Sequence, residues 1–318
     1  MCKCLDSGFA GFVCAPGMTM REKENCNVPM SPGYIPFHPN PSKPKYKPPA
    51  GAVDAHNHVF GPEAKFPFAP KRKYTPCDAP KEKLFALHDF LGFDKAVIVQ
   101  ATCHDTDNRA LIDAVVTSNG RAKGVAFLDE SFTDDQLKQM DRDGIKGARF
   151  NFIKRLVDST PKDVMVRIAN RIAKLGWHVV IYFEHADLDE MGPFLKSLPT
   201  TLVFDHMACP NVKEGVNGKQ FQNWLKALDE NKNWITKVTC PERFTLVGPP
   251  YDDVVPFART IVERFPDRVI WGTDWPHPNM PKEAPDDGVI TDMIPKIAPT
   301  AELQKKLLVD NPTKLYWG

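Results

Sequence analysis

Eight short runs of apolar and β-branched residues recur along this chain, and amphipathic segments lie between them. This alternation predicts repeated strand and helix units that share a parallel sheet. Eight units close a (β/α)8 barrel, an α/β fold that commonly needs about 250 residues. We therefore predict a TIM barrel over residues 51–318. The expected strands are 53–59, 96–101, 124–128, 147–152, 178–183, 201–205, 234–239 and 268–272, and the expected helices include 83–91, 109–117, 134–142, 163–175, 257–265 and 301–309.

Polar and ionisable residues gather at the C-terminal ends of these predicted strands. The first strand ends in a His-Asn-His sequence at 56–58, and the last is followed by Asp274. Side chains alternate along a strand, so His56 and His58 point to the same side. In a TIM barrel the loops at these ends converge on the active site. Further candidates there are Thr102, His104, Arg149, Arg155, Tyr182, Glu184, His206, Arg243, His277 and Asn279.

Asp274 is the natural general base for a hydrolytic reaction. We expect the flanking Trp271 and Trp275 to desolvate its carboxylate, which would raise its basicity. The imidazoles of His56, His58 and His206 could polarise a carbonyl group or donate to an oxyanion. The alternative use of Asp274 is to cap the helix that follows the last strand.

Three arginines come from different predicted strand ends, namely Arg149, Arg155 and Arg243. The planar guanidinium group binds a carboxylate through two parallel hydrogen bonds. The set therefore predicts a small-molecule substrate with more than one carboxylate. Salt bridges within the protein remain an alternative for Arg149 and Arg155. Tyr74 and Tyr182 could add neutral hydrogen bonds or could belong to the core.

Composition limits the partners and the compartment. A formal net charge of +1 predicts neither a nucleic-acid surface nor a polybasic membrane surface. No apolar run reaches the roughly 18 residues of a membrane span. The eight cysteines include no CxxC pair, so we expect reduced thiols in a cytoplasmic protein. Residues 1–50 contain nine prolines and no apolar periodicity, which predicts a poorly ordered leader or arm.

Longer stretches carry a specific resemblance. They are DAHNHVFGP, KFPFAPKRKY, FNFIKRLVD, GWHVVIYFE, TCPER, VIWGTDWPHPNM, PDDG and NPTKLYW, spread over residues 42–318. With these stretches the chain resembles the amidohydrolase superfamily. Within that superfamily it closely resembles the 2-pyrone-4,6-dicarboxylate lactonases of protocatechuate 4,5-cleavage and lignin-aromatic degradation.

The resemblance implies a (β/α)8 barrel that hydrolyses a cyclic pyrone ester to 4-carboxy-2-hydroxymuconate, with no metal and no other cofactor. It implies that Asp274 deprotonates water, while His56, His58 and His206 serve the lactone carbonyl and the water. It also implies a set of residues that hold the substrate and its carboxylates. That set is Tyr74, Thr102, Arg149, Arg155, Tyr182, Arg243, His277 and Asn279.

One departure from the relatives keeps other functions open. Relatives usually place a glycine and a basic residue between the strand-six histidine and the next proline, but this chain reads Met207-Ala208-Cys209. A missing cation would weaken carboxylate binding or change the preferred lactone. The alternatives are a lactonase for another anionic muconolactone, a zinc-dependent amidohydrolase or decarboxylase that uses the same histidines and Asp274, and a catalytically silent barrel that binds a ligand.

Overall fold

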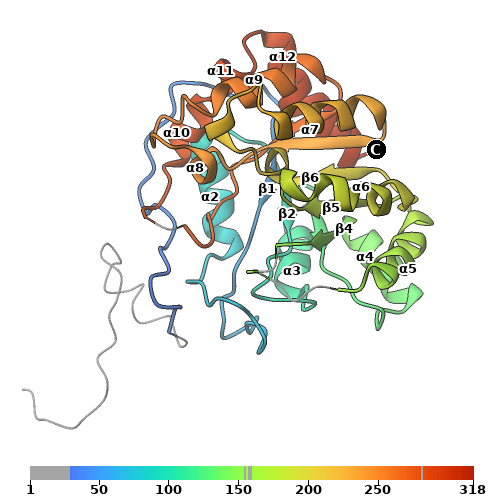
Figure 1. Ribbon diagram of the computed structural model, residues 1–318. Coiled ribbons are helices and arrows are strands. Elements are labelled where there is room, and N and C mark those ends of the chain that lie inside the picture. Colours follow the sequence, from blue (N-terminus) through green and yellow to red (C-terminus); the bar gives the residue numbers. More distant parts are fainter. Residues whose placement is uncertain (1–28, 154, 157–159, 281) are drawn as a thin grey trace, which may run out of the picture.

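The computed structural model describes residues 29–153, 155–156, 160–280 and 282–318. Its centre is a sheet of eight parallel strands, in which strands that are consecutive in sequence are hydrogen bonded. Helices surround this sheet (Figure 1). The predicted (β/α)8 barrel is confirmed, and every predicted strand overlaps an observed one. The strands are β1 (Val53–Asn57), β2 (Lys95–Val99), β3 (Ala122–Ala126), β4 (Ile145–Asn151), β5 (His178–Tyr182), β6 (Leu202–Phe204), β7 (Trp234–Val238) and β8 (Val269–Trp271).

The predicted helices are also present, with small shifts at their ends. The clearest difference lies at 301–309, where the α-helix stops at Lys305 and a π-helical turn follows. Among the described residues, no helix combines the length and apolarity needed to cross a bilayer. The longer helices are α2 (Lys81–Leu91), α3 (Arg109–Thr117), α4 (Asp134–Asp143), α5 (Lys162–Ala173), α6 (Leu188–Ser197), α7 (Lys219–Glu230) and α9 (Val255–Arg264). Shorter ones are α8 (Pro241–Phe244), α10 (Asp287–Asp292), α11 (Ile294–Ile297), α12 (Ala301–Lys305) and α13 (Asn311–Tyr316), with single turns at His185–Asp187, Asp205–Ala208, Val212–Glu214 and Lys306–Asp310.

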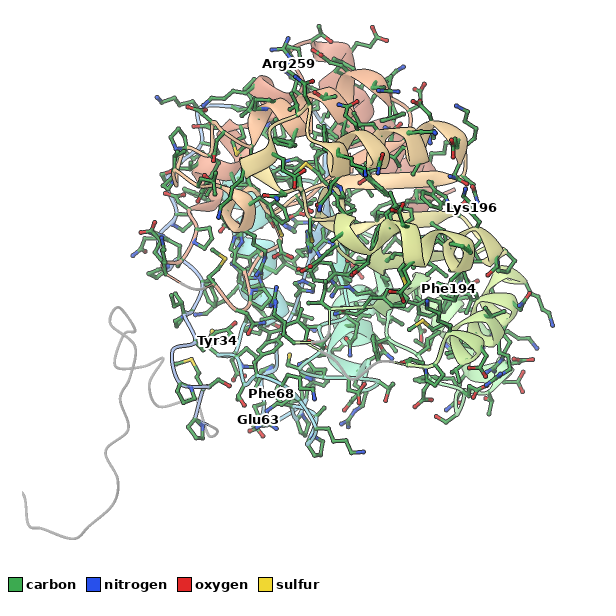
Figure 2. All side chains as sticks on the ribbon, in the orientation of Figure 1. Tyr34, Glu63, Phe68, Phe194, Lys196 and Arg259 are labelled. Atoms are coloured by element: carbon green, nitrogen blue, oxygen red, sulfur yellow. The ribbon has the colours of Figure 1, made fainter. Side chains whose placement is uncertain are left out.

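Apolar packing fills the barrel except at its C-terminal end. Valines from several strands form an interior cluster with Tyr316 of α13, which contacts His178 at the N-terminal end of β5. A second, larger core lies between the sheet and the helices. Side chains fill both layers, while the labelled Lys196 and Arg259 lie at the periphery (Figure 2). The predicted site residues His58, His206 and Asp274 lie at the opposite, C-terminal end of the strands.

The seam between β1 and β8 is closed largely by one buried carboxylate. Asp54 of β1 accepts hydrogen bonds from the backbone N and the hydroxyl of Thr273, at 3.0 and 2.6 Å. His88 of α2 donates to the same carboxylate at 2.9 Å. Beyond it, the backbone N of Asp274 donates to the carbonyl of His56 at 2.8 Å. These contacts fix the His-Asn-His segment against the segment that carries Asp274.

The described part of the proline-rich arm is held against the barrel by hydrogen bonds. It lies beside α2 and α10 (Figure 1). The backbone N of Ser42 donates to both carboxylate oxygens of Asp286, and that of Tyr46 donates to Asp292 at 2.8 Å. A Cβ on Gly288 would lie 1.9 Å from the Ser42 carbonyl oxygen, so only glycine permits this approach. Residues 1–28 lie outside the described residues.

Candidate active site

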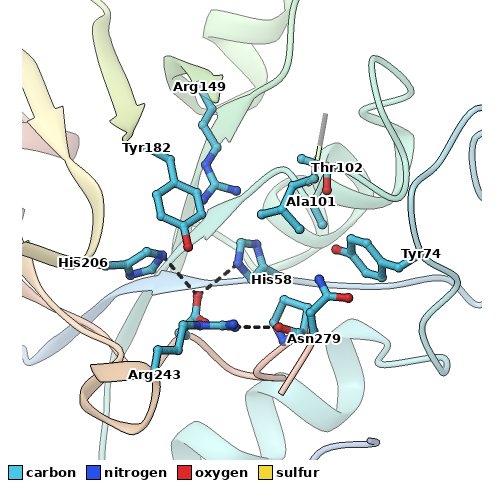
Figure 3. A pocket seen from close by; sticks show the side chains of 12 residues that line it. His58, Tyr74, Ala101, Thr102, Arg149, Tyr182, His206, Arg243 and Asn279 are labelled. Atoms are coloured by element: carbon cyan, nitrogen blue, oxygen red, sulfur yellow. Dashed lines mark hydrogen bonds and ion pairs between the residues drawn. The ribbon is translucent and has the colours of Figure 1, made fainter. Parts of the chain in front are cut away.

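A pocket of about 360 Å³ opens at the C-terminal end of the barrel (Figure 3). Loops after most of the strands contribute to it, as the sequence predicts for a TIM barrel. His56 lies next to its floor, in contact with Asp274. The lining residues are His58, Tyr74, Ala101, Thr102, Arg149, Leu156, Tyr182, His206, Arg243, Asp274, Pro278 and Asn279.

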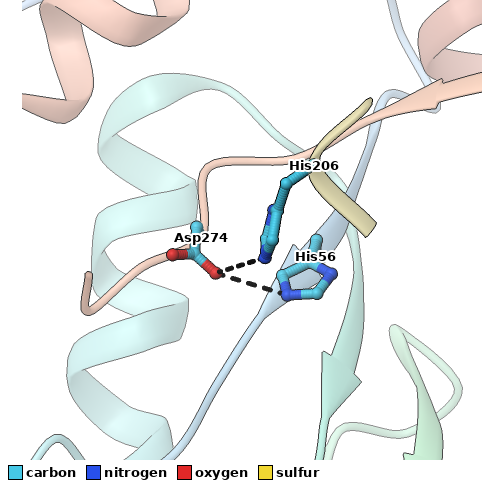
Figure 4. A group of neighbouring side chains, drawn as sticks. All are labelled: His56, His206 and Asp274. Atoms are coloured by element: carbon cyan, nitrogen blue, oxygen red, sulfur yellow. Dashed lines mark ion pairs between the residues drawn. The ribbon is translucent and has the colours of Figure 1, made fainter. Parts of the chain in front are cut away.

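Three imidazoles converge on one oxygen of Asp274. The Nε2 atoms of His56 and His58 each lie 3.3 Å from Asp274 Oδ1, and Nε2 of His206 lies 3.9 Å away. Figure 4 shows His56 and His206 next to each other, each joined to the same oxygen of Asp274 by a dashed line. All four side chains are buried. The histidines from strands one and six therefore lie beside the acid that follows strand eight.

The predicted rise in the basicity of Asp274 is wrong. Burial does raise its pKa, but the adjacent Arg243 and the histidines outweigh burial and bring the pKa well below the usual range. Arg243 Nη2 lies 3.0 Å from Asp274 Oδ2. Trp271 stacks on Phe93, and Trp275 packs at a tilt against Phe37. Asp274 is therefore an ionised carboxylate at neutral pH.

His58 presents a lone pair to the pocket. Its Nδ1 lies 2.7 Å from the carbonyl oxygen of Val99, which can only accept a hydrogen bond. Burial lowers the pKa of His58, so the ring is neutral near pH 7 and its Nε2 carries no proton. The 3.3 Å contact between His58 Nε2 and Asp274 Oδ1 has hydrogen-bond geometry, but in this tautomer it joins two acceptors. A water molecule has two O–H donors and can satisfy both.

His56 is backed by a buried lysine that the sequence reasoning missed. Lys237 of β7 places Nζ 2.8 Å from His56 Nδ1 and 3.2 Å from Asp205 Oδ1, and all three side chains are fully buried. Burial lowers the pKa of Lys237, while Asp205 acts in the opposite direction. A signal was present in the sequence, because a lysine within an apolar strand is rarely buried unless it is paired.

Two of the predicted substrate arginines pair with carboxylates of the protein. Arg149 Nη2 lies 2.9 Å from Asp205 Oδ2, and its guanidinium stacks on the ring of Tyr182. Arg243 bonds Asp274 and the carbonyl of Pro278. Among the described residues, the buried Nε of Arg243 has no hydrogen-bond acceptor. Both arginines line the pocket, so their internal pairing leaves donors for a substrate anion.

His277 does not line the pocket. Its Nδ1 lies 3.1 Å from Glu242 Oε1 and its Nε2 lies 3.0 Å from Asp287 Oδ1. Burial would lower the pKa of His277, but the two carboxylates raise it to about 10. The ring is therefore a buried imidazolium with both N–H groups engaged. It braces the loop after β8 against α8 and α10.

The remaining predicted residues separate into two groups. Tyr74, Thr102, Tyr182 and Asn279 line the pocket. Burial raises the pKa of both tyrosines, which keeps their hydroxyls protonated as hydrogen-bond donors. In contrast, Arg155 is exposed, and neither Arg155 nor Cys209 lines this pocket.

Strained backbone is concentrated at the ends of β6, β7 and β8. His206, Cys240 and Asp274 have φ values of 53, 58 and 68°. Such left-handed conformations cost a non-glycine residue about 1 kcal/mol or more, and they collect at functional sites. The segment from His206 to Cys209 holds four such residues in succession. This turn directs the His206 ring toward Asp274.

A cation could reach part of this cluster. Nε2 atoms of His56 and His206 and one carboxylate oxygen of Asp274 lie within 4.8 Å of one another. On strand five, however, Tyr182 occupies the pocket, and the Nε2 of His185 is bonded to the carbonyl of Met207. The cluster therefore lacks the strand-five histidine that the zinc-dependent alternative would use as a ligand.

Comparison with known proteins agrees with this geometry. The amidohydrolase family model matches residues 53–317. The 2-pyrone-4,6-dicarboxylate hydrolase of Comamonas testosteroni is 59% identical, over 90% of this chain and 97% of that protein. The 4-sulfomuconolactone hydrolase of Rhizobium radiobacter is 36% identical, over 84% and 90%. An apo crystal structure from Agrobacterium tumefaciens superposes with a TM-score of 0.76 at 26% identity, covering 86% of this chain and 98% of that one. The chain belongs to the amidohydrolase family.

Proposed function

We propose that this protein is a lactonase that hydrolyses 2-pyrone-4,6-dicarboxylate to 4-carboxy-2-hydroxymuconate. The observation that carries the proposal is the convergence of His56, His58 and His206 on Asp274 Oδ1 at the floor of the pocket. The 59% identity to the Comamonas testosteroni 2-pyrone-4,6-dicarboxylate hydrolase supports the choice of substrate.

The first step is the activation of water by Asp274. Water donates one hydrogen bond to Asp274 Oδ1 and the other to the Nε2 lone pair of His58, which orients an oxygen lone pair toward the lactone carbonyl. As that oxygen attacks the carbonyl carbon, its proton passes to Asp274. A carboxylate with a low pKa is a weak base, so the positioning of the water must supply much of the rate.

The second step is the collapse of the tetrahedral intermediate. His206, held by a 2.6 Å contact between Nδ1 and the Thr239 hydroxyl, donates from Nε2 to the oxyanion. The ester C–O bond then breaks, and Asp274 returns the proton to the departing ring oxygen. Water and lactone are thus converted to the ring-opened acid, with Asp274 again ionised.

The substrate carboxylates are assigned to the cationic and neutral donors around the pocket. The unpartnered Nε of Arg243 and the outer edge of Arg149 face one carboxylate, and Arg155 approaches from the exposed side to hold the other. Tyr74, Thr102, Tyr182 and Asn279 supply neutral hydrogen bonds. His277 does not contact the substrate in this proposal, and it instead stabilises the loop that carries Asn279.

Metal independence is part of the proposal and is supported by charge. Arg149, Lys237 and Arg243 place three cations against Asp205 and Asp274. A divalent cation would add two further positive charges to a cluster that is already net positive. If zinc is bound after all, His56, His206 and Asp274 would hold it, and it would polarise the carbonyl or the water. A cytoplasmic location also belongs to the proposal, in keeping with the thiols of Cys103, Cys209 and Cys240, which form no disulfide with another described residue.

The test is loss of the pyrone ultraviolet absorbance when purified protein of known metal content meets 2-pyrone-4,6-dicarboxylate. We expect turnover that survives a chelator. Activity that disappears with the chelator and returns with zinc would contradict metal independence while keeping the lactonase. Absence of turnover under both conditions, with turnover of a different anionic muconolactone, would contradict the substrate.

A further inference from the structure

We infer that Lys237 is a positioning residue that holds His56 in the tautomer with its proton on Nε2, toward Asp274. The catalytic consequence of this inference rests on the proposed function, but the tautomer itself does not. Lys237 touches neither the pocket nor the reacting atoms, and it acts through the imidazole alone.

The first step is the direction of the hydrogen bond between Lys237 and His56. The Asp205 carboxylate, 3.2 Å from Nζ, favours the ammonium form of Lys237. An ammonium has three donors and no lone pair, so it can only donate across the 2.8 Å to His56 Nδ1. Nδ1 must then accept, and the proton of the neutral ring must lie on Nε2. That atom lies 3.3 Å from Asp274 Oδ1. Its N–H forms no hydrogen bond to a described residue in this geometry, but its positive end lies beside the carboxylate.

The second step is the competition that Lys237 prevents. Asp205 Oδ1 lies 3.1 Å from the same Nδ1 and would accept a proton from it. Asp205 is held in place by Arg149, at 2.9 Å from its other oxygen. Without the lysine, the carboxylate would draw the ring proton to Nδ1. Nε2 of His56 would then present a lone pair to Asp274, as His58 already does.

The two histidines thus have opposite tautomers although they come from one strand. His58 donates from Nδ1 to the carbonyl of Val99 and keeps Nε2 free to accept from water. His56 accepts at Nδ1 from Lys237 and so carries its proton on Nε2, 3.3 Å from Asp274 Oδ1. One therefore fixes the carboxylate and the other fixes the water. The sequence His-x-His is symmetric, but the partners of the two Nδ1 atoms differ. A carbonyl oxygen accepts from His58 and an ammonium donates to His56, so the two rings carry their protons on different nitrogens.

The first experiment substitutes Lys237 by methionine, which keeps the length of the side chain and removes its donors. Ring nitrogens of 15N-histidine-labelled protein are read by NMR, with the His56 signals assigned by their loss in His56→Gln. We expect the protonated nitrogen to be Nε2 in the native chain and Nδ1 in Lys237→Met. We also expect kcat on the pyrone to fall about 10- to 100-fold, the usual cost of losing a group that orients a histidine, with KM little changed.

The matched control is Lys146→Met. Lys146 lies on β4, where it pairs with Asp141 at 2.7 Å. It is likewise a strand lysine paired with an aspartate, but it has no contact with His56. We expect this variant to keep both the native tautomer and the native kcat.

The second experiment combines Lys237→Met with Asp205→Asn. The amide that replaces Asp205 can donate to His56 Nδ1 and still accept from Arg149. The double change also keeps the net charge of the Arg149, Asp205 and Lys237 group at +1. We therefore expect the Nε2 tautomer to return, kcat to recover to within a few-fold of the native value and the melting temperature to rise above that of the single variant.

The outcomes separate the tautomer from the reaction. A native Nδ1 tautomer, an unchanged tautomer in Lys237→Met, or a double variant no better than the single one would overturn the inference. If Lys237→Met does not fold, the double variant decides, and loss of the Nε2 tautomer there counts against the role. If the native chain fails to open the pyrone while the tautomers behave as expected, the proposed function fails and the inference stands.

Discussion

The floor of the pocket and its rim are built in different ways. We define the floor as the pocket-lining His58, His206 and Asp274 together with His56, Asp205 and Lys237 behind them. We define the rim as the pocket-lining Leu156 and Asn279 together with Arg155 and Cys209 outside the lining. The floor residues are buried and contact one another or the backbone through hydrogen bonds and ion pairs, whereas the rim residues are partly or fully exposed.

This difference indicates that substrate preference can change without a change in stability or in the catalytic groups. A buried charge costs several kcal/mol unless it is paired, so a change in the floor alters folding and catalysis together. An exposed side chain of the rim can change with little effect on stability. Relatives named for 2-pyrone-4,6-dicarboxylate and for 4-sulfomuconolactone match this chain over most of its length. We expect the floor to set the reaction and the rim to set the lactone.

The largest effect is expected in the floor, from Asp274→Asn. The amide cannot take a proton from water, so kcat should fall about 10²- to 10⁴-fold while KM changes little. Steady-state kinetics on the pyrone measures both constants. The control is Asp135→Asn, whose side chain is 93% exposed and forms one surface ion pair. A kcat for Asp274→Asn close to native would show that another group is the base.

Just outside the floor, His277→Gln should reduce stability. The pKa of His277 is raised to about 10 from an unfolded value near 6.5, so its contribution is complete below about pH 6.5 and is lost as the pH rises through 10. The change leaves Glu242 and Asp287 without their imidazolium, at a cost of about 3 kcal/mol near neutral pH.

Urea unfolding of both chains between pH 6.5 and 10 checks this prediction. The difference in unfolding free energy should shrink steadily as the pH rises, because only the native chain has the imidazolium to lose. A difference that stays constant with pH would mean that packing, and not charge, explains the cost.

The fold and most of the site could be predicted because their signals are local. Strand periodicity and the position of polar residues at strand ends located His56, His206 and Asp274 correctly. The pKa direction of Asp274 could not be predicted, because it depends on Arg243, which is 31 residues away in sequence. Tautomers and ion pairs depend on distances below 4 Å between elements, and sequence spacing does not contain them.

The partners of His277 illustrate the same limit. A histidine after the last strand fits a substrate ligand as well as it fits a structural imidazolium. Glu242 and Asp287 decide between these roles, and they come from α8 and α10. Both acids stand in stretches that the family resemblance includes, TCPER and PDDG. The two motifs therefore pointed to Glu242 and Asp287 as functional acids. Their contact with His277 becomes visible only in the folded structure.

At the rim, Arg155→Met should raise KM about tenfold and leave kcat nearly unchanged. An exposed guanidinium can hold a substrate carboxylate equally in the ground state and the transition state, so its loss weakens uniform binding. The kinetics of Arg259→Met provide the control, since Arg259 is a surface residue of α9 paired with Glu263. A fall in kcat for Arg155→Met, with KM unchanged, would move Arg155 from the rim to the catalytic groups.

The smallest effect is expected from Cys209→Lys, which restores the cation that relatives usually carry near this position. Cys209 is half-buried and has a φ of 59°, a conformation that an unbranched lysine tolerates about as well as cysteine. The new charge should lower KM for the pyrone dicarboxylate only about two- to fivefold, because Glu184 lies close enough to compete for it. Cys209→Met supplies length without charge and should leave KM unchanged. If Cys209→Lys instead lowered KM by a hundredfold or more, the native chain would be adapted to a lactone with one fewer carboxylate, and the rim would define a different substrate for the same floor.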